Sequence, residues 1–251
     1  MAQQFKVNLP IGYSDQDGHL HREATLRKMR GYDEELLYDE NLNAGQLVTQ
    51  LLASCIQRLG DIEVLDADII SELYTADRNY LLLELRRITL GNSLSSAHQC
   101  PQCGQSVTVV DDLSELEVTR LKRNHHLREI TLTLEDGYED RKGEVHRQMV
   151  LGLPKGWDEE FVAPMVRRNP LKAQDVLLLR CIKQFGSLSK EVLESYGVKI
   201  LRELTIGDRQ QIQHALSDGV PGVNFQRSLQ CNTCGNRFEG MMDISGFFVL
   251  G

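Results

Sequence analysis

The sequence has no apolar run near the roughly 18 residues that a membrane-spanning helix needs. Its first residues, MAQQFKVNLP, also lack the basic region followed by an apolar stretch that marks a secretory signal. We therefore expect a cytoplasmic protein without a membrane span, in a compartment where thiols stay reduced. In such a protein, Cys-x-x-Cys pairs favour a metal over a disulfide.

Basic residues are in the minority, since 28 Lys and Arg stand against 36 Asp and Glu and give a formal net charge of −8. Because nucleic acids are bound by an excess of Lys and Arg, no nucleic-acid partner is expected. The short basic cluster KRNHHLR, residues 122–128, is interpreted as a solvated linker. With 41% apolar residues in 251, the chain can form one sizeable core or two small domains.

Common catalytic motifs are missing too. The sequence has no phosphate-binding glycine loop, no nucleophile elbow and no metalloprotease helix motif. We therefore predict that the protein is not an enzyme and has no catalytic residues.

An internal repeat runs along the chain in constant order. The segment GYSDQDGHLHRE at Gly12 matches GYEDRKGEVHRQ at Gly137, 125 positions later, and RGYDEELL (30–37) matches KGWDEEFV (155–162) at the same offset. Collinear matches over nearly the whole chain indicate a duplication.

The offset then grows in two steps. CIQRLG at Cys55 matches CIKQFG at Cys181, 126 positions later, and CPQCG at Cys100 matches CNTCG at Cys231, 131 positions later. One residue is thus added in the second copy before Cys181 and five more after it, and we expect both additions in loops. We assign residues 1–118 to the first repeat, 119–126 to a linker and 127–251 to the second repeat, with the two repeats packed as one zinc-linked unit.

Each repeat is predicted to be an α+β unit consisting of a β-hairpin, helices, a cysteine knuckle and a strand. Alternating apolar residues from Phe5 and from Ile130 predict the first strands, and the second strands pass through His21 and His146. Helices are predicted over residues 44–59 and 77–90, the second ending at Gly91, and strands over residues 106–110 and 237–242. Asp77 and Asp208 are expected at helix N-termini. The counterpart helix near residues 208–216 is more polar, so the first should be the more buried.

Both knuckles have the form Cys-x-x-Cys-Gly, in which the glycine permits a tight turn around the sulfur. One knuckle supplies two thiolates, whereas a structural zinc takes four ligands. We therefore predict that the two knuckles meet near a pseudo-twofold axis and share one structural zinc per chain, bound by Cys100, Cys103, Cys231 and Cys234. Four thiolates leave no open position for catalysis. A disulfide within each knuckle, or a redox pair, is the alternative.

Other polar residues are interpreted as structural. His98 precedes the first knuckle, but its counterpart is Leu229, so it is not counted as a ligand. Cys55 and Cys181 fall on apolar helix faces and should lie in cores. The Asp15-x-Asp17-Gly18 loop resembles the start of a calcium loop, but its counterpart carries Lys142, and we interpret it as a turn. The recurring His21 and His146 are interpreted as surface or packing residues.

The stretch ADRNYLLLELRRITLGN followed by HQCPQCG resembles the T4-type bacteriophage baseplate proteins, which include a baseplate hub assembly factor, with relatives in contractile injection systems. The resemblance rests on Arg86, Thr89 and Gly91 and on the CPxCG knuckle, and it covers about the first half of the chain. It implies a non-enzymatic part or assembly factor of a contractile tail, in the cytoplasm or in a phage tail-like particle. The implied partners are baseplate, spike, tube or wedge proteins in a multimeric assembly.

Two other classes remain open at this point. One is a zinc-ribbon protein that binds nucleic acid or assists transcription, which the net charge opposes. The other is a redox or zinc-dependent enzyme, which four thiolate ligands oppose.

Overall fold

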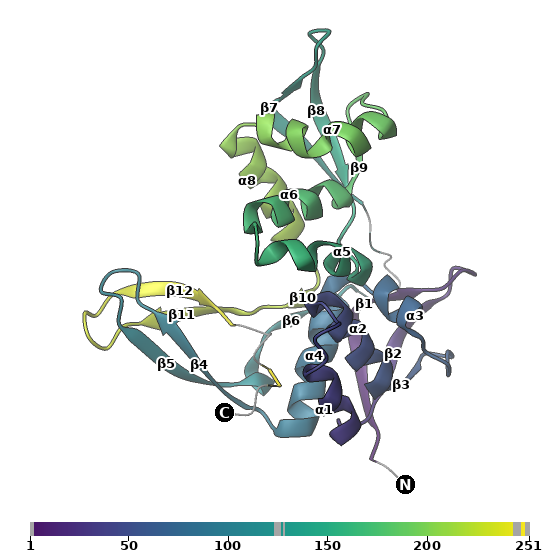
Figure 1. Ribbon diagram of the computed structural model, residues 1–251, viewed down its shortest axis with the longest axis vertical. Coiled ribbons are helices and arrows are strands. Elements are labelled where there is room, and N and C mark those ends of the chain that lie inside the picture. The colour runs from purple at the N-terminus through teal and green to yellow at the C-terminus, as the bar shows by residue number, and fades with distance from the viewer. Residues whose placement is uncertain (1–2, 123–126, 128, 243–246, 249–251) are drawn as a thin grey trace.

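The computed structural model describes residues 3–122, 127, 129–242 and 247–248, and structural statements below refer to these. Figure 1 shows three parts: a lower core built from the first half of the chain, an upper core built from the second, and an arm of paired strands extending to one side. Most of the basic cluster at residues 122–128, and residues 123–126 of the linker at 119–126, lie outside the described residues. None of the described helices has the length and apolarity to span a membrane.

The first core is a three-stranded antiparallel sheet in the order β1-β2-β3, packed against helices. Its strands are β1 (Phe5–Ser14), β2 (Leu20–Leu26) and β3 (Ile56–Leu59). Its helices are α1 (Gly31–Leu37), α2 (Ala44–Cys55), α3 (Ala67–Glu72) and α4 (Thr75–Leu90). Leu52, Leu81 and Leu85 are fully buried between these layers.

The second core has the same element order and the same sheet topology, β7-β8-β9. Its strands are β7 (Ile130–Glu139), β8 (Val145–Leu151) and β9 (Ile182–Phe185). Its helices are α5 (Gly156–Val166), α6 (Pro170–Cys181), α7 (Lys190–Glu203) and α8 (Ile206–Ser217). As expected, α4 is the more buried of the matching helices, since it buries five apolar side chains whereas α8 buries Ile212.

The arm consists of two antiparallel hairpins, one from each half. One contains β4 (Ser93–Gln99) and β5 (Ser106–Asp112), and the other contains β11 (Gln226–Gln230) and β12 (Arg237–Met241). At the base of the arm, the short helix η1 (Leu113–Glu115) leads to β6 (Val118–Thr119), which pairs with β10 (Gly222–Val223) of the other half. Phe225 and Phe247 of the second half pack into the first core, so the chain returns to its starting lobe.

One predicted helix boundary, the strands around the knuckles and the place of the added residues need correction. The helix predicted over residues 44–59 ends at Cys55, because Ile56 and Leu59 pair with β2 as strand β3 and bury their side chains. A strand also precedes each knuckle, so each knuckle is the turn of a hairpin. The five added residues lengthen a helix rather than a loop, since α3 has 6 residues and its counterpart α7 has 14.

The two aspartates expected at helix N-termini bind the first strand of their own half. The Asp77 carboxylate accepts hydrogen bonds from the amides of Ile11 and Gly12, each at 2.8 Å. The Asp208 carboxylate accepts them from the amides of Glu135, Asp136 and Gly137. Both carboxylates lie where the register of the hairpin shifts, between Asn8 and Tyr13 or between Thr133 and Tyr138. The same bulge is thus held by the same side chain in both halves.

Helix α5 of the second half docks on the first core. Glu160 lies against Gly45, whose missing side chain allows the close approach, and its carbonyl accepts a hydrogen bond from Asn43. The fully buried Arg78 pairs with Glu159 at 3.0 Å and donates to Thr49 at 2.8 Å. The cores are therefore joined by a polar interface that is independent of the cysteines.

Candidate metal centre

The two knuckles form equivalent turns at the ends of their hairpins. In the first, the Cys100 amide donates to the Gln105 carbonyl and the Gly104 amide to the Cys100 carbonyl. The second repeats this with the amides of Cys231 and Gly235. Gly104 and Gly235 have φ values of 71° and 73°, a left-handed conformation that side-chain-bearing residues rarely adopt. The glycines therefore set the turn that brings both sulfurs of each knuckle to one side.

The four predicted ligands lie together, and the close pairs join the two halves. Cys100 Sγ is 3.6 Å from Cys234 Sγ, and Cys103 Sγ is 3.7 Å from Cys231 Sγ. All four sulfurs lie within 4.8 Å of one another, and no disulfide joins them. Zinc–sulfur distances of about 2.3 Å in a tetrahedron place sulfurs about 3.8 Å apart. The donor set and its spacing therefore fit a four-thiolate metal ion.

The electrostatics of the cluster divide the thiols into two kinds. Burial raises the pKa of the Cys100 thiol, but hydrogen bonds from the amides of Cys103 and Gln102 outweigh it and lower that pKa to about 6. The Cys234 sulfur accepts the Asn236 amide, yet burial and the neighbouring cysteines raise its pKa to about 12. A divalent cation at the centre would stabilise all four thiolates at once.

The surroundings support the cluster from both hairpins. Cys100 and Cys231 are buried with Val107 and with the half-buried Phe238. The Asn236 side-chain amide lies 3.9 Å from Cys100 Sγ, and Arg227 pairs with Asp111 across the hairpins at 3.0 Å. The sequence reasoning missed these supporting residues, because nothing in their local pattern shows which hairpin they face.

Two further cysteines and two histidines lie in the surroundings that the sequence predicts for them. Cys55 is fully buried in the first core, and burial raises its thiol pKa to about 12. Cys181 is buried too, and burial raises its pKa to about 12.

His98 is hydrogen-bonded to Ser96 at 3.1 Å and is not in the cysteine cluster. His21 is a packing residue, buried against Gly60 and stacked on Tyr13.

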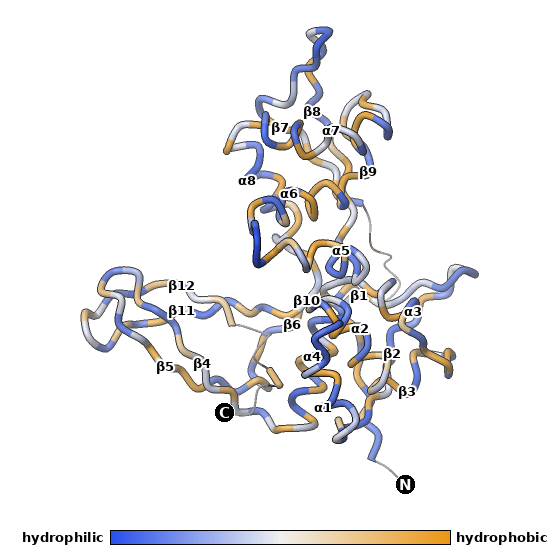
Figure 2. The backbone as a smooth tube through the Cα atoms, viewed as in Figure 1, coloured by the Kyte–Doolittle hydropathy of each residue, from blue (hydrophilic) through white to orange (hydrophobic). Residues whose placement is uncertain are grey.

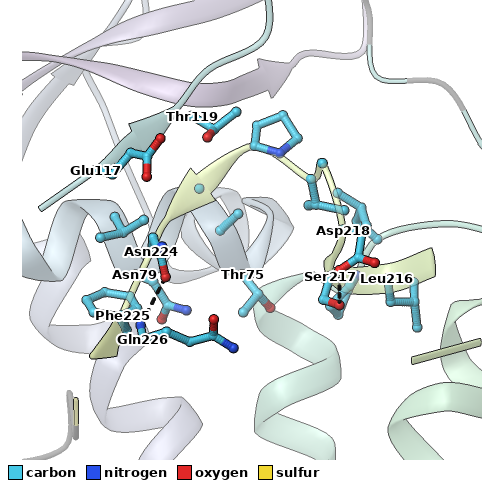
Figure 3. Close-up of a pocket in the computed structure, with 18 of the residues that line it drawn as sticks. Thr75, Asn79, Glu117, Thr119, Leu216, Ser217, Asp218, Asn224, Phe225 and Gln226 are labelled. Carbon is cyan, nitrogen blue, oxygen red and sulfur yellow. Dashed lines mark hydrogen bonds between the residues drawn. The ribbon is translucent and has the colours of Figure 1, made fainter. Parts of the chain in front are cut away.

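A crevice of about 610 Å³ opens where the two cores meet the base of the arm. Figure 3 shows Asn79, Asn224 and Gln226 lying close together in it, and the Asn224 backbone amide donates to the Glu117 carbonyl at 2.9 Å. Its lining is a mixture of amides, carboxylates and apolar groups from segments far apart in sequence. The sequence reasoning did not find it, since it exists only where β6, β10 and α4 come together.

The fold and the cysteine cluster define a two-lobed α+β protein whose halves meet again in a cysteine-tipped arm. A family model described as T4 bacteriophage base plate protein matches residues 2–249, and the chain belongs to that family. The match covers both halves, which corrects the expectation that the resemblance ends near the middle of the chain. No curated protein and no solved structure matches the chain.

Proposed function

We propose that this protein is a non-enzymatic structural or assembly component of the baseplate of a phage-like contractile tail or injection system. The observation that carries the proposal is the family match over residues 2–249. Its partners are other baseplate, spike, tube or wedge proteins, which it meets in the cytoplasm during assembly or in the finished particle. A shape of two lobes and a projecting arm offers several separate surfaces for such contacts (Figure 1).

We propose further that Cys100, Cys103, Cys231 and Cys234 hold one structural zinc per chain. The cross-half sulfur distances of 3.6 and 3.7 Å support it. Such an ion contributes roughly 10–16 kcal/mol of apparent binding energy in model peptides. Its chemistry here is cross-linking, because four protein thiolates leave no position for a substrate or water.

The two halves are proposed to be copies of one ancestral unit, related by pseudo-twofold symmetry around the zinc. The common element order and the matched contacts of Asp77 and Asp208 support this origin. The symmetry does not extend to the docking of α5, since Leu171, the counterpart of Gly45, is 68% exposed.

The proposed role is tested by expressing the tagged chain with the other tail proteins of its source and identifying what co-purifies by mass spectrometry. We expect baseplate, spike, tube or wedge proteins in fixed ratio to the chain. Assembly of complete, functional tails without the chain would contradict the proposal. Retention of the purified chain on DNA at moderate salt, against its net charge of −8, would favour the nucleic-acid-binding alternative.

A further inference from the structure

The tip of the β7–β8 hairpin brings three metal-ligating side chains together, far in sequence from the cysteines. Asp140, Glu144 and His146 each offer a ligand atom, and these atoms lie within 4.8 Å of one another. The position of Asp140 is fixed, because its Oδ1 accepts the amides of Lys142 at 2.8 Å and Glu144 at 3.0 Å. The hairpin tip is hydrophilic in Figure 2 and stands at the far end of the upper core.

A buried histidine nitrogen points into this cluster without a hydrogen-bond partner. His146 is 3% exposed, stacks on Tyr138 and is covered by Gly186, so its ring has little freedom to turn. Its Nε2 forms no hydrogen bond within the described part of the chain and lies 3.6 Å from Asp140 Oδ2. That distance is too long for a hydrogen bond. A buried polar atom left without a partner destabilises the fold.

The same separation suits a shared metal ion. A nitrogen and an oxygen each about 2.1 Å from a tetrahedral cation lie about 3.4 Å apart. His146 Nδ1 lies 3.4 Å from both the backbone amide nitrogen and Oγ of Ser187, and the amide donates to it. When the ion binds Nε2, the ring proton moves to Nδ1, and Ser187 Oγ replaces the amide as the partner of Nδ1 and accepts that proton. Ser187 Oγ in turn donates at 2.8 Å to Glu144 Oε1, which lies 3.9 Å from His146 Nδ1, and this bond orients the second carboxylate of the cluster.

We propose that Asp140, Glu144 and His146 form a second metal site that binds a divalent first-row transition metal such as Zn²⁺ or Co²⁺. Two carboxylates and one imidazole are typical ligands for these ions. A cavity of about 610 Å³ beside the three residues gives solvent room to complete the coordination. Because the Glu144 side chain is 58% exposed, the ion exchanges with solvent, unlike one enclosed by the four cysteines.

The first half supplies an internal comparison, because the histidine equivalent to His146 already has a hydrogen-bond partner there. His21 Nε2 lies 2.8 Å from Asp15 Oδ2, so that nitrogen already has a partner. The position of Glu144 is occupied there by His19, which is exposed. In the acidic turn of the first half, ligand atoms of Asp15, Asp17 and His19 also lie within 4.8 Å of one another, but His19 is exposed and the buried His21 Nε2 is already paired. Variants of this turn therefore serve as controls that have similar ligands but no buried unpaired nitrogen.

The test is equilibrium dialysis of the full-length protein against micromolar Zn²⁺, with bound zinc counted by atomic emission. We expect one exchangeable zinc per chain in addition to the zinc that dialysis does not remove. Glu144→Gln should weaken the exchangeable site at least tenfold, and His146→Asn should abolish it. Asp15→Asn should leave it unchanged.

Loss of zinc from one proposed site can be distinguished from loss of zinc from the other. In Cys231→Ser, the non-dialysable zinc should be lost while the exchangeable zinc stays, and Co²⁺ bound there should give no intense thiolate charge-transfer absorption. Because Glu144 is exposed, Glu144→Gln should keep the wild-type circular dichroism and melting temperature, so a loss of zinc is not caused by unfolding. No exchangeable zinc below millimolar Zn²⁺, or equal weakening by Asp15→Asn, would overturn the proposal.

Discussion

Single residues show that the two halves keep the same contact while changing which residue provides it. In the first half, Asp33 is held by Arg27 at 2.6 and 2.9 Å and by Ser54. In the second half, its counterpart Asp158 is held by Arg180, which occupies the position of Ser54. Both halves keep the buried carboxylate. The arginine that pairs with it follows strand β2 in the first half and lies on helix α6 in the second. A buried charge requires a partner, but several positions can supply one.

The Asp33 contact predicts a defined loss of stability in acid. Burial raises the pKa of Asp33, but hydrogen bonds from Arg27, Ser54 and the Arg30 amide outweigh it and lower the pKa from 3.8 to about 2. Since the folded pKa is the lower one, this stabilisation is complete above about pH 4 and is lost as the pH falls to about 2. It amounts to about 2 kcal/mol. Urea unfolding from pH 5 to 2 should show a smaller acid slope in Asp33→Asn, and an unchanged slope would contradict the assignment.

The cysteine assignment predicts that one knuckle cannot hold the non-dialysable zinc alone. Cys231→Ser removes a ligand that lies 3.7 Å from Cys103 Sγ of the other half. Tightly bound zinc, measured by atomic emission after dialysis, should fall from about one per chain to nearly none. Cys181→Ala, a buried cysteine outside the cluster, should keep it. Equal zinc in both variants would exclude the four-cysteine centre.

At the scale of elements, the docking of α5 has no equivalent in the second half. Arg78 lies within the first core but takes its carboxylate from α5 of the other half. Its counterpart Arg209 pairs at 2.6 Å with Asp175, which stands at the position of Thr49. The second core thus satisfies its own arginine, and Leu171 occupies the position at which Gly45 admits α5. These two differences make the docking one-sided.

Gly45→Leu should break this interface. A Cβ at residue 45 would lie 2.6 Å from the backbone of Glu160, so α5 must move and leave Arg78 without Glu159. Separating a buried ion pair costs 3–5 kcal/mol, and we expect a loss of about 3 kcal/mol in the free energy of unfolding.

Leu171→Ala is the matched control, since the equivalent side chain in the second half is exposed, and it should change stability by less than about 0.5 kcal/mol. Chemical denaturation measures both. Similar effects of the two variants would show that the close approach at Gly45 is not needed.

For the whole molecule, two separate links join the halves: the α5 interface between the cores and the cysteine cluster at the tip of the arm (Figure 1). The sequence predicts that the two repeats pack as one zinc-linked unit, and the α5 interface is a further link that it did not include. The proposed ion would cross-link two hairpins whose bases are already fixed by the β6–β10 pair. Its contribution should be local to the arm.

Removal of the metal by a strong chelator should consequently open the arm and leave the cores docked. In hydrogen exchange, amides of β4, β5, β11 and β12 should lose protection, because two-stranded hairpins are marginally stable alone. Amides of α2 and α5 should keep theirs. Loss of protection in α2 and α5 at the same chelator concentration would show that the ion also holds the cores together.

Much of the fold followed from local patterns. The strands that begin at Phe5 and at Ile130, the end of α4 at Gly91 and the meeting of the two cysteine knuckles were predicted correctly. The strand β3 was missed because Ile56 and Leu59 continue the helical spacing of apolar residues, and pairing with β2 decides their state. Arg78 was missed as a docking residue because its partner Glu159 lies 81 positions away in the other half.

The sequence by itself determined the repeated elements, the α+β class and the four cysteines that cluster, because these depend on short-range periodicity and on side-chain chemistry. The tertiary structure decided which surfaces meet: the docking of α5 on the first core, the packing of Phe247 there, and the isolated Nε2 of His146. These depend on distances of a few tenths of an ångström between segments far apart in the chain. Local patterning carries no information about such distances.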